Sequence, residues 1–216
     1  MTTIVCFGDS NTWGCPPFAN IAQTPDRIVP ARRWPNILGR ELGEGTWVVE
    51  EGLSGRTTVF DDPIEGTHKN GSRTLIPILE SHAPMDMLIV MLGTNDFKDQ
   101  LRISAYNSAR GVLTLVQMIK GHFALVEHPP EVLIVTPPSI GEMAEPAIWG
   151  EGYRRCRDHA HYLEQVATRT GCFHFDANRV VSCGIDGIHL DEAAHDTLGR
   201  AIAEEVAAIM RMRNAT

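Results

Sequence analysis

A serine stands directly after an apolar segment near the start of the chain. Residues 4–7 read Ile-Val-Cys-Phe, as in a buried strand, and Gly8, Asp9 and Ser10 follow them. In an open parallel sheet, reactive groups gather at the carboxyl ends of strands, where a following helix directs backbone N–H groups at negative charge. A serine hydroxyl placed there can attack an acyl carbon if a base removes its proton. Ser10 is therefore our candidate nucleophile.

The other end of the chain offers that base. Asp186 precedes His189 by three residues, and Asp191, a plausible helix N-cap, follows them. A histidine held by a carboxylate can take a proton from serine and return it, so Ser10, His189 and Asp186 have the composition of an acyl-transfer triad. Asp9 is an alternative carboxylate. As the neighbour of Ser10 it cannot easily reach the far nitrogen of the imidazole, and we expect it to bond local backbone.

Two further strand ends carry small polar residues that suit an oxyanion hole. One segment, residues 51–58, contains Gly55, and another, residues 93–96, reads Gly-Thr-Asn-Asp and contains Asn95. A tetrahedral intermediate needs donors aimed at its oxygen. The backbone N–H groups of Ser10 and Gly55 and the side-chain amide of Asn95 are our candidates. Each segment alone is also compatible with an ordinary turn.

Apolar patterning predicts the elements that position these residues. Short apolar runs indicate buried strands at residues 4–7, 47–50, 87–92, 132–135 and 172–176. Helical spacing is found at residues 33–42, 72–82, 104–123, 153–170 and 191–212.

Strands that alternate with helices predict an α/β fold, a three-layer α/β/α sandwich around a five-stranded parallel sheet. The length, the absence of a Ser/Gly-rich linker and the lack of repeats predict a single domain over residues 1–216. Three connections, residues 15–32, 57–71 and 137–152, are long for a compact domain. We expect them to form pocket walls or subunit contacts; surface decoration is the alternative.

The composition limits the kinds of binding partner and the cellular compartment that we expect for this protein. The formal net charge is −8, and Lys and Arg are scattered, which argues against nucleic acid and anionic membranes. No segment is apolar enough to span a membrane, and Met1 leads into a strand without a signal-peptide pattern, so we expect a cytoplasmic protein. The five cysteines form no Cys-x-x-Cys pair, and His159 and His161 lie on different faces of a helix. We therefore predict neither a metal nor another cofactor.

Together the four polar segments resemble the motif blocks of the GDSL or SGNH hydrolase superfamily, in order and over nearly the whole chain. Phrases at residues 33–35, 50–58 and 61–63 are similar to the bacterial arylesterase and acyltransferase (perhydrolase) branch. The resemblance implies a flavodoxin-like SGNH fold, the roles named above for the triad and the oxyanion donors, and a cytosolic homo-oligomer. Asn11 departs from the family pattern, which has leucine beside the nucleophile.

The substrate pocket is less sharply defined than the triad. Residues near the motif ends that could line it are Trp13, Thr94, Phe97, Lys98, Trp149 and Ile188. The resemblance places the counterparts of Thr94, Lys98 and Ile188 close to substrate. The aromatic residues are also compatible with plain core positions, and Lys98 with a surface charge or an inter-subunit partner of an acidic loop.

These observations predict a serine esterase that acts on short-chain acyl or aryl esters through an acyl-enzyme. Its partner is a small-molecule ester. Transfer of the acyl group to alcohols or hydrogen peroxide, as in a perhydrolase, is a narrower possibility within the same chemistry. Deacetylation of carbohydrates is an alternative, and a catalytically silent binding module on the same sandwich is another.

Overall fold

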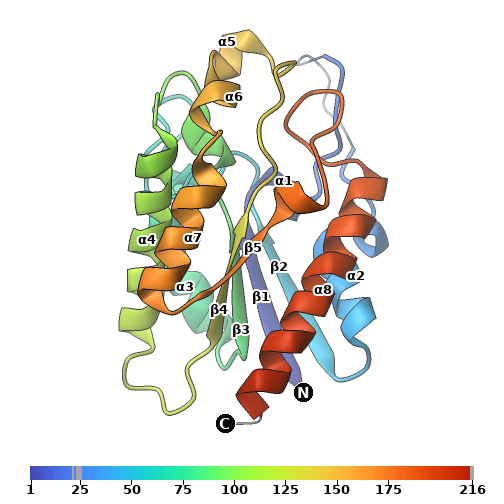
Figure 1. Ribbon diagram of the computed structural model, residues 1–216, viewed down its shortest axis with the longest axis vertical. Coiled ribbons are helices and arrows are strands. Elements are labelled where there is room, and N and C mark those ends of the chain that lie inside the picture. Colours follow the sequence, from blue (N-terminus) through green and yellow to red (C-terminus); the bar gives the residue numbers. More distant parts are fainter. Residues whose placement is uncertain (21, 23–25, 215–216) are drawn as a thin grey trace.

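The computed structural model describes residues 1–20, 22 and 26–214. Its centre is a five-stranded parallel sheet in the order β2-β1-β3-β4-β5 (Figure 1), which confirms the predicted α/β architecture. The strands are β1 (Thr2–Gly8), β2 (Thr46–Gly52), β3 (Met87–Met91), β4 (Glu131–Thr136) and β5 (Phe173–Asp176). Each lies within two residues of its predicted bounds.

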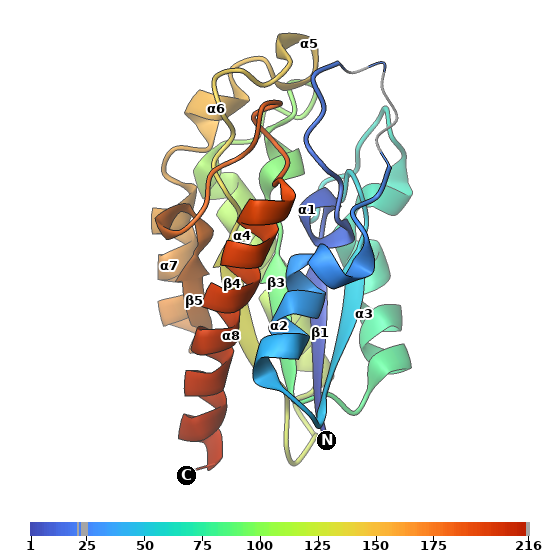
Figure 2. The same ribbon diagram turned by 90° about the vertical axis from the view of Figure 1, so that its right-hand side faces the viewer.

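Helices cover both faces of the sheet. On one face lie α2 (Trp34–Leu42) and α8 (Glu192–Asn214), and on the other lie α3 (Gly71–His82), α4 (Ala105–His122) and α7 (His159–Thr170) (Figures 1 and 2). Alternate residues of β1 serve the two layers: Ile4 and Cys6 pack toward α2 and α8, whereas Val5 and Phe7 pack toward the other helices. This two-sided burial explains why the strands read as continuous apolar runs.

The largest departure from the predicted elements is in residues 153–170. A single helix is wrong there, because the chain forms α6 (Gly152–Arg155), turns, and resumes as α7 at His159. Arg155 donates to the backbone oxygens of Phe97 and Trp149, and His159 points into the interior. Tertiary contacts of these polar side chains accompany the break, whereas helical spacing alone predicts continuity.

Short helices occupy segments predicted only as connections. They are α1 (Ser10–Trp13), α5 (Pro146–Trp149) and the 3-10 turns η1 (Pro30–Arg32), η2 (Thr67–Lys69), η3 (Thr94–Phe97) and η4 (Ala177–Arg179). The side chain of Glu145 accepts from the Ala147 amide and so starts α5. In the described part of the chain, no helix combines the length and the apolar character needed to cross a membrane.

The strand order places a topological switch point at β1. β2 pairs with one side of β1, and β3 pairs with the other side. The loops that follow β1 and β3 therefore diverge at the carboxyl ends of these two strands. Ligand sites of open parallel sheets lie in the crevice at such a point. Ser10, Gly55 and Asn95 all follow one of these three strands.

Candidate active site

Ser10 is held at the start of α1 by its neighbours. Asp9 caps this short helix by accepting a hydrogen bond from the Asn11 amide at 3.0 Å, as its predicted bonding to local backbone requires. Gly52 allows α1 to rest on the end of β2, because a Cβ there would lie 2.2 Å from the Trp13 nitrogen. Ser10 is consequently fixed on backbone supported by two strands.

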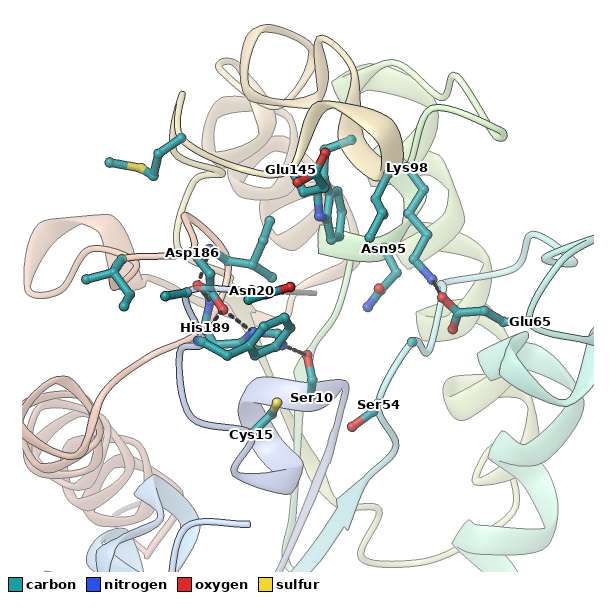
Figure 3. A pocket seen from close by; sticks show the side chains of 18 of the residues that line it. Ser10, Cys15, Asn20, Ser54, Glu65, Asn95, Lys98, Glu145, Asp186 and His189 are labelled. Atoms are coloured by element: carbon teal, nitrogen blue, oxygen red, sulfur yellow. Dashed lines mark hydrogen bonds and ion pairs between the residues drawn. The ribbon is translucent and has the colours of Figure 1, made fainter. Parts of the chain in front are cut away.

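A chain of hydrogen bonds runs from Ser10 to Asp186 (Figure 3). The Nε2 of His189 lies 3.0 Å from the Ser10 Oγ, and the Nδ1 of His189 lies 2.7 Å from the Asp186 Oδ2. Asp186 and His189 belong to the irregular segment before α8, and Asp191 begins that helix by accepting from the Ala194 amide at 2.8 Å. The contact of His189 with Asp186 rather than Asp9 agrees with the sequence prediction.

Asp186 is suited to remain ionised. Its Oδ1 accepts from the amides of Ile188 and His189, both at 2.9 Å, while Oδ2 contacts the imidazole. Burial by itself raises the pKa of Asp186, but these hydrogen bonds outweigh burial and hold the pKa below its usual value. Burial likewise opposes the charged form of His189, yet the contacts with Asp186 and Cys15 together outweigh burial and raise the pKa of His189 above 6.5.

Asn11 connects the serine helix to the histidine segment. Its Nδ2 donates to the Ile188 oxygen at 3.0 Å, and its Oδ1 accepts from the Leu190 amide at 2.9 Å. These two backbone groups flank His189. A leucine, which the resembling family carries at this position, has no polar atoms to make either bond.

Gly55 and Asn95 face the same space as Ser10. Asn95 is buried on η3, and its Nδ2 donates to the Arg56 oxygen at 3.1 Å and lies 3.4 Å from the Asp9 Oδ2. Gly55 has a φ of 81°, a left-handed conformation that favours glycine. A Cβ at Gly55 would lie 2.1 Å from the Glu65 Oε2, so a side chain there would also displace this carboxylate.

These residues open into a cavity of about 520 Å³. Its apolar wall includes Phe18, Ile148, Trp149 and Ile188, and the Phe18 ring centroid lies 5.3 Å from that of His189. A polar wall on another side includes Ser54, Glu65 and Lys98 (Figure 3), and Lys69 joins this wall through a hydrogen bond from its Nζ to the Ser54 oxygen at 2.6 Å. All three long connections contribute to the lining, as the sequence predicts; residues 21 and 23–25 of the first lie outside the described residues.

A comparison with protein-family models matches residues 6–197 to the GDSL-like lipase/acylhydrolase family. The chain belongs to the GDSL-like lipase/acylhydrolase family. Among solved structures, this GDSL-family chain is similar to a carbohydrate acetylesterase from Sinorhizobium meliloti, with 37% identity, a TM-score of 0.91 and coverage of 97% of this chain and 100% of that chain. It is also similar to the native aryl esterase of M. smegmatis, with 37% identity, a TM-score of 0.91 and coverage of 96% and 99%. A search of curated proteins gave no significant match.

The cavity of this GDSL-family member contains half of the residues predicted to line it. Lys98, Trp149 and Ile188 line the cavity, whereas Trp13, Thr94 and Phe97 are absent from its described lining. Trp13 ends α1, and its ring stacks under Arg27, whose Cζ lies 4.8 Å from the ring centroid. Thr94 and Phe97 lie behind the wall, against a separate small void beside His159. Phe97 is thus a core residue, the alternative considered for the aromatic residues.

Lys98 is neither a surface charge nor in need of a partner from a second subunit. Its side chain is 3% exposed, and its Nζ contacts the Asp62 Oδ2 at 3.2 Å and the Glu65 Oε1. The acidic loop of the same chain therefore neutralises it. Sequence reasoning missed Glu65 and Lys69 as lining residues; the acidic run at residues 61–65 and the length of that loop were the available signals.

Side chains that could bind a metal are dispersed. Within residues 1–20, 22 and 26–214, no three His, Cys, Asp or Glu side chains gather in a way that could hold an ion.

Proposed function

We propose that the protein is a serine esterase that hydrolyses short-chain acyl or aryl esters through an acyl-enzyme. The observation that carries this proposal is the continuous hydrogen-bonded chain of Ser10, His189 and Asp186 at the floor of the cavity. Neutral His189 takes the proton of Ser10 as Oγ attacks the ester carbonyl. Asp186 accepts a hydrogen bond from the Nδ1–H of His189, which fixes the tautomer, and it stabilises the imidazolium that forms.

The developing oxyanion is stabilised by donors from three segments. The Ser10 and Gly55 amides and the Asn95 Nδ2 are assigned this role, because all three residues line the cavity beside the nucleophile. One N–H of Asn95 is committed to the Arg56 oxygen. The other meets the Asp9 carboxylate at 3.4 Å, longer than a usual hydrogen bond, and is available to a substrate oxygen.

The two halves of the reaction use His189 in turn. Collapse of the tetrahedral intermediate breaks the bond to the leaving alcohol, which receives the proton from His189, and leaves the acyl group on Ser10. Water then attacks this ester while His189 takes its proton. A second collapse releases the acid and returns the proton to Ser10.

The choice of substrate class rests on the cavity and on the relatives. Its apolar wall of Phe18, Ile148, Trp149 and Ile188 suits a short acyl chain or an aromatic leaving group. An alcohol or hydrogen peroxide in place of water would make the same acyl-enzyme a transferase. Product analysis with added alcohol separates the two: an ester-to-acid ratio no greater than the mole fraction of alcohol predicts would exclude a preference for acyl transfer.

Carbohydrate deacetylation is the second candidate. The similarity to the Sinorhizobium meliloti carbohydrate acetylesterase favours it, as do the polar side chains of Glu65 and Lys69 on one wall. Release of acetate from acetylated monosaccharides, measured beside p-nitrophenyl acetate hydrolysis, distinguishes a sugar preference from a general esterase.

Replacement of the nucleophile tests the proposal. We expect Ser10→Ala to lose about 10⁶ in kcat for p-nitrophenyl acetate while melting at the wild-type temperature. Ser182→Ala, at an exposed serine that is not among the described lining residues, is the matched control and is expected to keep full activity. An organophosphonate is expected to label Ser10 alone. Unchanged hydrolysis by Ser10→Ala, or no labelling, contradicts the assignment and favours a silent binding module.

We further propose a cytoplasmic homo-oligomer that binds neither nucleic acid nor membranes. Five free cysteines suit a reducing compartment. Met143 and Ile185, which are 64% and 69% exposed, stand at the cavity rim, where a second subunit would cover them. The native mass in solution tests the oligomer.

A further inference from the structure

A cluster of buried polar side chains lies behind the candidate oxyanion hole, outside the cavity. Asp96, Ser108 and Thr58 are each fully buried, and His159 is 3% exposed. They come from four separate segments: η3, α4, the connection after β2, and α7. None lines the cavity within the described residues, and none takes part in the mechanism above.

The hydrogen bonds of this cluster converge on the Asp96 carboxylate. Oδ1 accepts from the Thr58 amide at 2.9 Å, while Oδ2 accepts from the hydroxyls of Thr58 and Ser108, both at 2.7 Å. The hydroxyl of Ser108 has one proton, which it donates to Asp96. The Ser108 oxygen therefore accepts from the Nε2–H of His159, at 3.1 Å. The cluster is therefore a directed chain from His159 through Ser108 to Asp96.

Close packing leaves the cluster little freedom to rearrange. A Cβ on Gly93 would lie 2.3 Å from the His159 Cε1, and a Cβ on Gly111 would lie 2.1 Å from the Thr58 Oγ1. Both glycines thus let backbone approach the cluster more closely than any side chain permits. Fully bonded buried polar groups of this kind fix one arrangement of the segments that carry them.

The cluster fixes the two segments that carry the candidate oxyanion donors Gly55 and Asn95. The third donor, the Ser10 amide, belongs to α1. Asp96 follows Asn95, and Thr58 lies three residues after Gly55. The bonds between Asp96 and Thr58 join these segments, and the Asn95 amide bond to the Arg56 oxygen joins them again next to the cavity. The relative position of Gly55 and Asn95 is consequently set by both contacts.

We propose that Asp96, Ser108, His159 and Thr58 are positioning residues that hold Asn95 and the Gly55 segment in register for the oxyanion. The inference rests on the proposed esterase function and deepens it. None of the four touches substrate; each acts through the two donors. Catalysis requires such donors to be held in place before the charge develops, since a misplaced donor stabilises it poorly.

The test is a double-mutant cycle between Ser108 and Asn95. Ser108→Ala removes the link between His159 and Asp96, and we expect kcat for p-nitrophenyl acetate to fall about tenfold with KM changed less than about twofold. Affinity for phenylboronic acid, which forms a tetrahedral adduct with the serine, is expected to fall in parallel with kcat. In the Asn95→Ala background, the same Ser108→Ala change is expected to cost clearly less than in the wild type, because one of the two donors that it positions is already gone.

Two further variants separate positioning from loss of folding. Thr58→Val removes a hydroxyl bonded to Asp96 and is expected to reproduce the kcat loss. Thr136→Val is the control: Thr136 is also a buried residue whose hydroxyl meets a histidine, His174, at 2.8 Å. His174 acts on His159 through its charge alone, and no hydrogen bond among the described residues joins the pair to the cluster. We expect Thr136→Val to change the melting temperature without changing kcat or boronate affinity.

The outcomes distinguish this inference from the function on which it rests. Wild-type kcat in Ser108→Ala, or a Ser108→Ala loss that is equally large with and without Asn95, overturns the positioning network while the esterase stands. Full activity of Asn95→Ala alone overturns both the oxyanion assignment and the network.

Discussion

The side chain of Asn11 holds the backbone on both sides of His189, with a bond to the Ile188 oxygen at 3.0 Å and one from the Leu190 amide at 2.9 Å. The residue next to the candidate nucleophile thereby sets where the candidate base sits. Two segments from opposite ends of the chain are joined by one carboxamide. The distance between the Ser10 Oγ and the His189 Nε2 depends on this contact as well as on Asp186.

Replacing Asn11 by the family's leucine is expected to disturb that distance. Asn11→Leu takes the acceptor from the buried Leu190 amide, which costs about 1–3 kcal/mol for the unsatisfied group, and leaves the Ile188 oxygen with the weaker Cys183 thiol donor at 3.2 Å. We expect kcat for p-nitrophenyl acetate to fall about tenfold, with a lower melting temperature. Asn11→Asp, which keeps the acceptor for Leu190 but not the donor to Ile188, should lie between. An unaltered kcat in Asn11→Leu would show that His189 does not need this clamp.

Asp186 governs the pH at which His189 becomes a base. Against the lowering effect of burial, Asp186 and Cys15 together raise the pKa of His189 above 6.5, and only the neutral imidazole can take the serine proton. kcat/KM is therefore expected to rise with pH through a midpoint above 6.5. In Asp186→Asn the contribution of the carboxylate is lost while burial and the Cys15 contact remain, so the midpoint moves to lower pH.

The same variant is expected to be slow at every pH. An asparagine can donate to Nδ1 and so favours the wrong tautomer, and the matching change in a serine-protease triad lowers kcat by roughly 10⁴. A kcat/KM profile for wild type and Asp186→Asn checks both effects. A midpoint that stays in place would mean that another group titrates.

The buried ion pair of Lys98 and Asp62 supports the polar wall. Asp62 has no exposed side-chain surface, so removal of its cation in Lys98→Met leaves a buried carboxylate unpaired. We expect the free energy of unfolding in urea to fall by about 3 kcal/mol. The double variant Asp62→Asn/Lys98→Met should recover part of this loss, because it removes the buried charge and leaves only the Glu65 carboxylate, which is 38% exposed, without its cation. Equal stability of the single and double variants would count against the pair.

Acyl-chain length is expected to follow the apolar wall. Trp149, which is 7% exposed, closes the cavity together with Ile148 and Ile188. Across p-nitrophenyl esters from acetate to octanoate, we expect kcat/KM to be highest for the short chains. Trp149→Ala is expected to shift the preference to longer chains by opening space. A wild-type optimum at octanoate would overturn the short-chain assignment.

Much of this arrangement could be predicted from residue patterns, and the failures share a physical cause. Buried parallel strands such as β1 and β3 can be recognised in the sequence as apolar runs. Ser10 and Asn95 could then be predicted as site residues because they follow the ends of these strands. The break before α7 and the core position of Phe97 depend instead on contacts with distant segments, through Arg155 and His159. The roles of Asn11 and Glu65 likewise depend on partners that no local pattern specifies.

The placement of Ser10 and His189 has a consequence for how the protein loses activity. Ser10 follows the strand flanked by β2 and β3, while His189 precedes the fully buried Leu190 and the helix that covers the sheet. The residues are 179 positions apart, so their contact closes a loop of nearly the whole chain. Detachment of α8 would separate them even if the sheet survived. Ester hydrolysis should therefore report the cooperativity of unfolding, disappearing with the first step that frees either end of the chain.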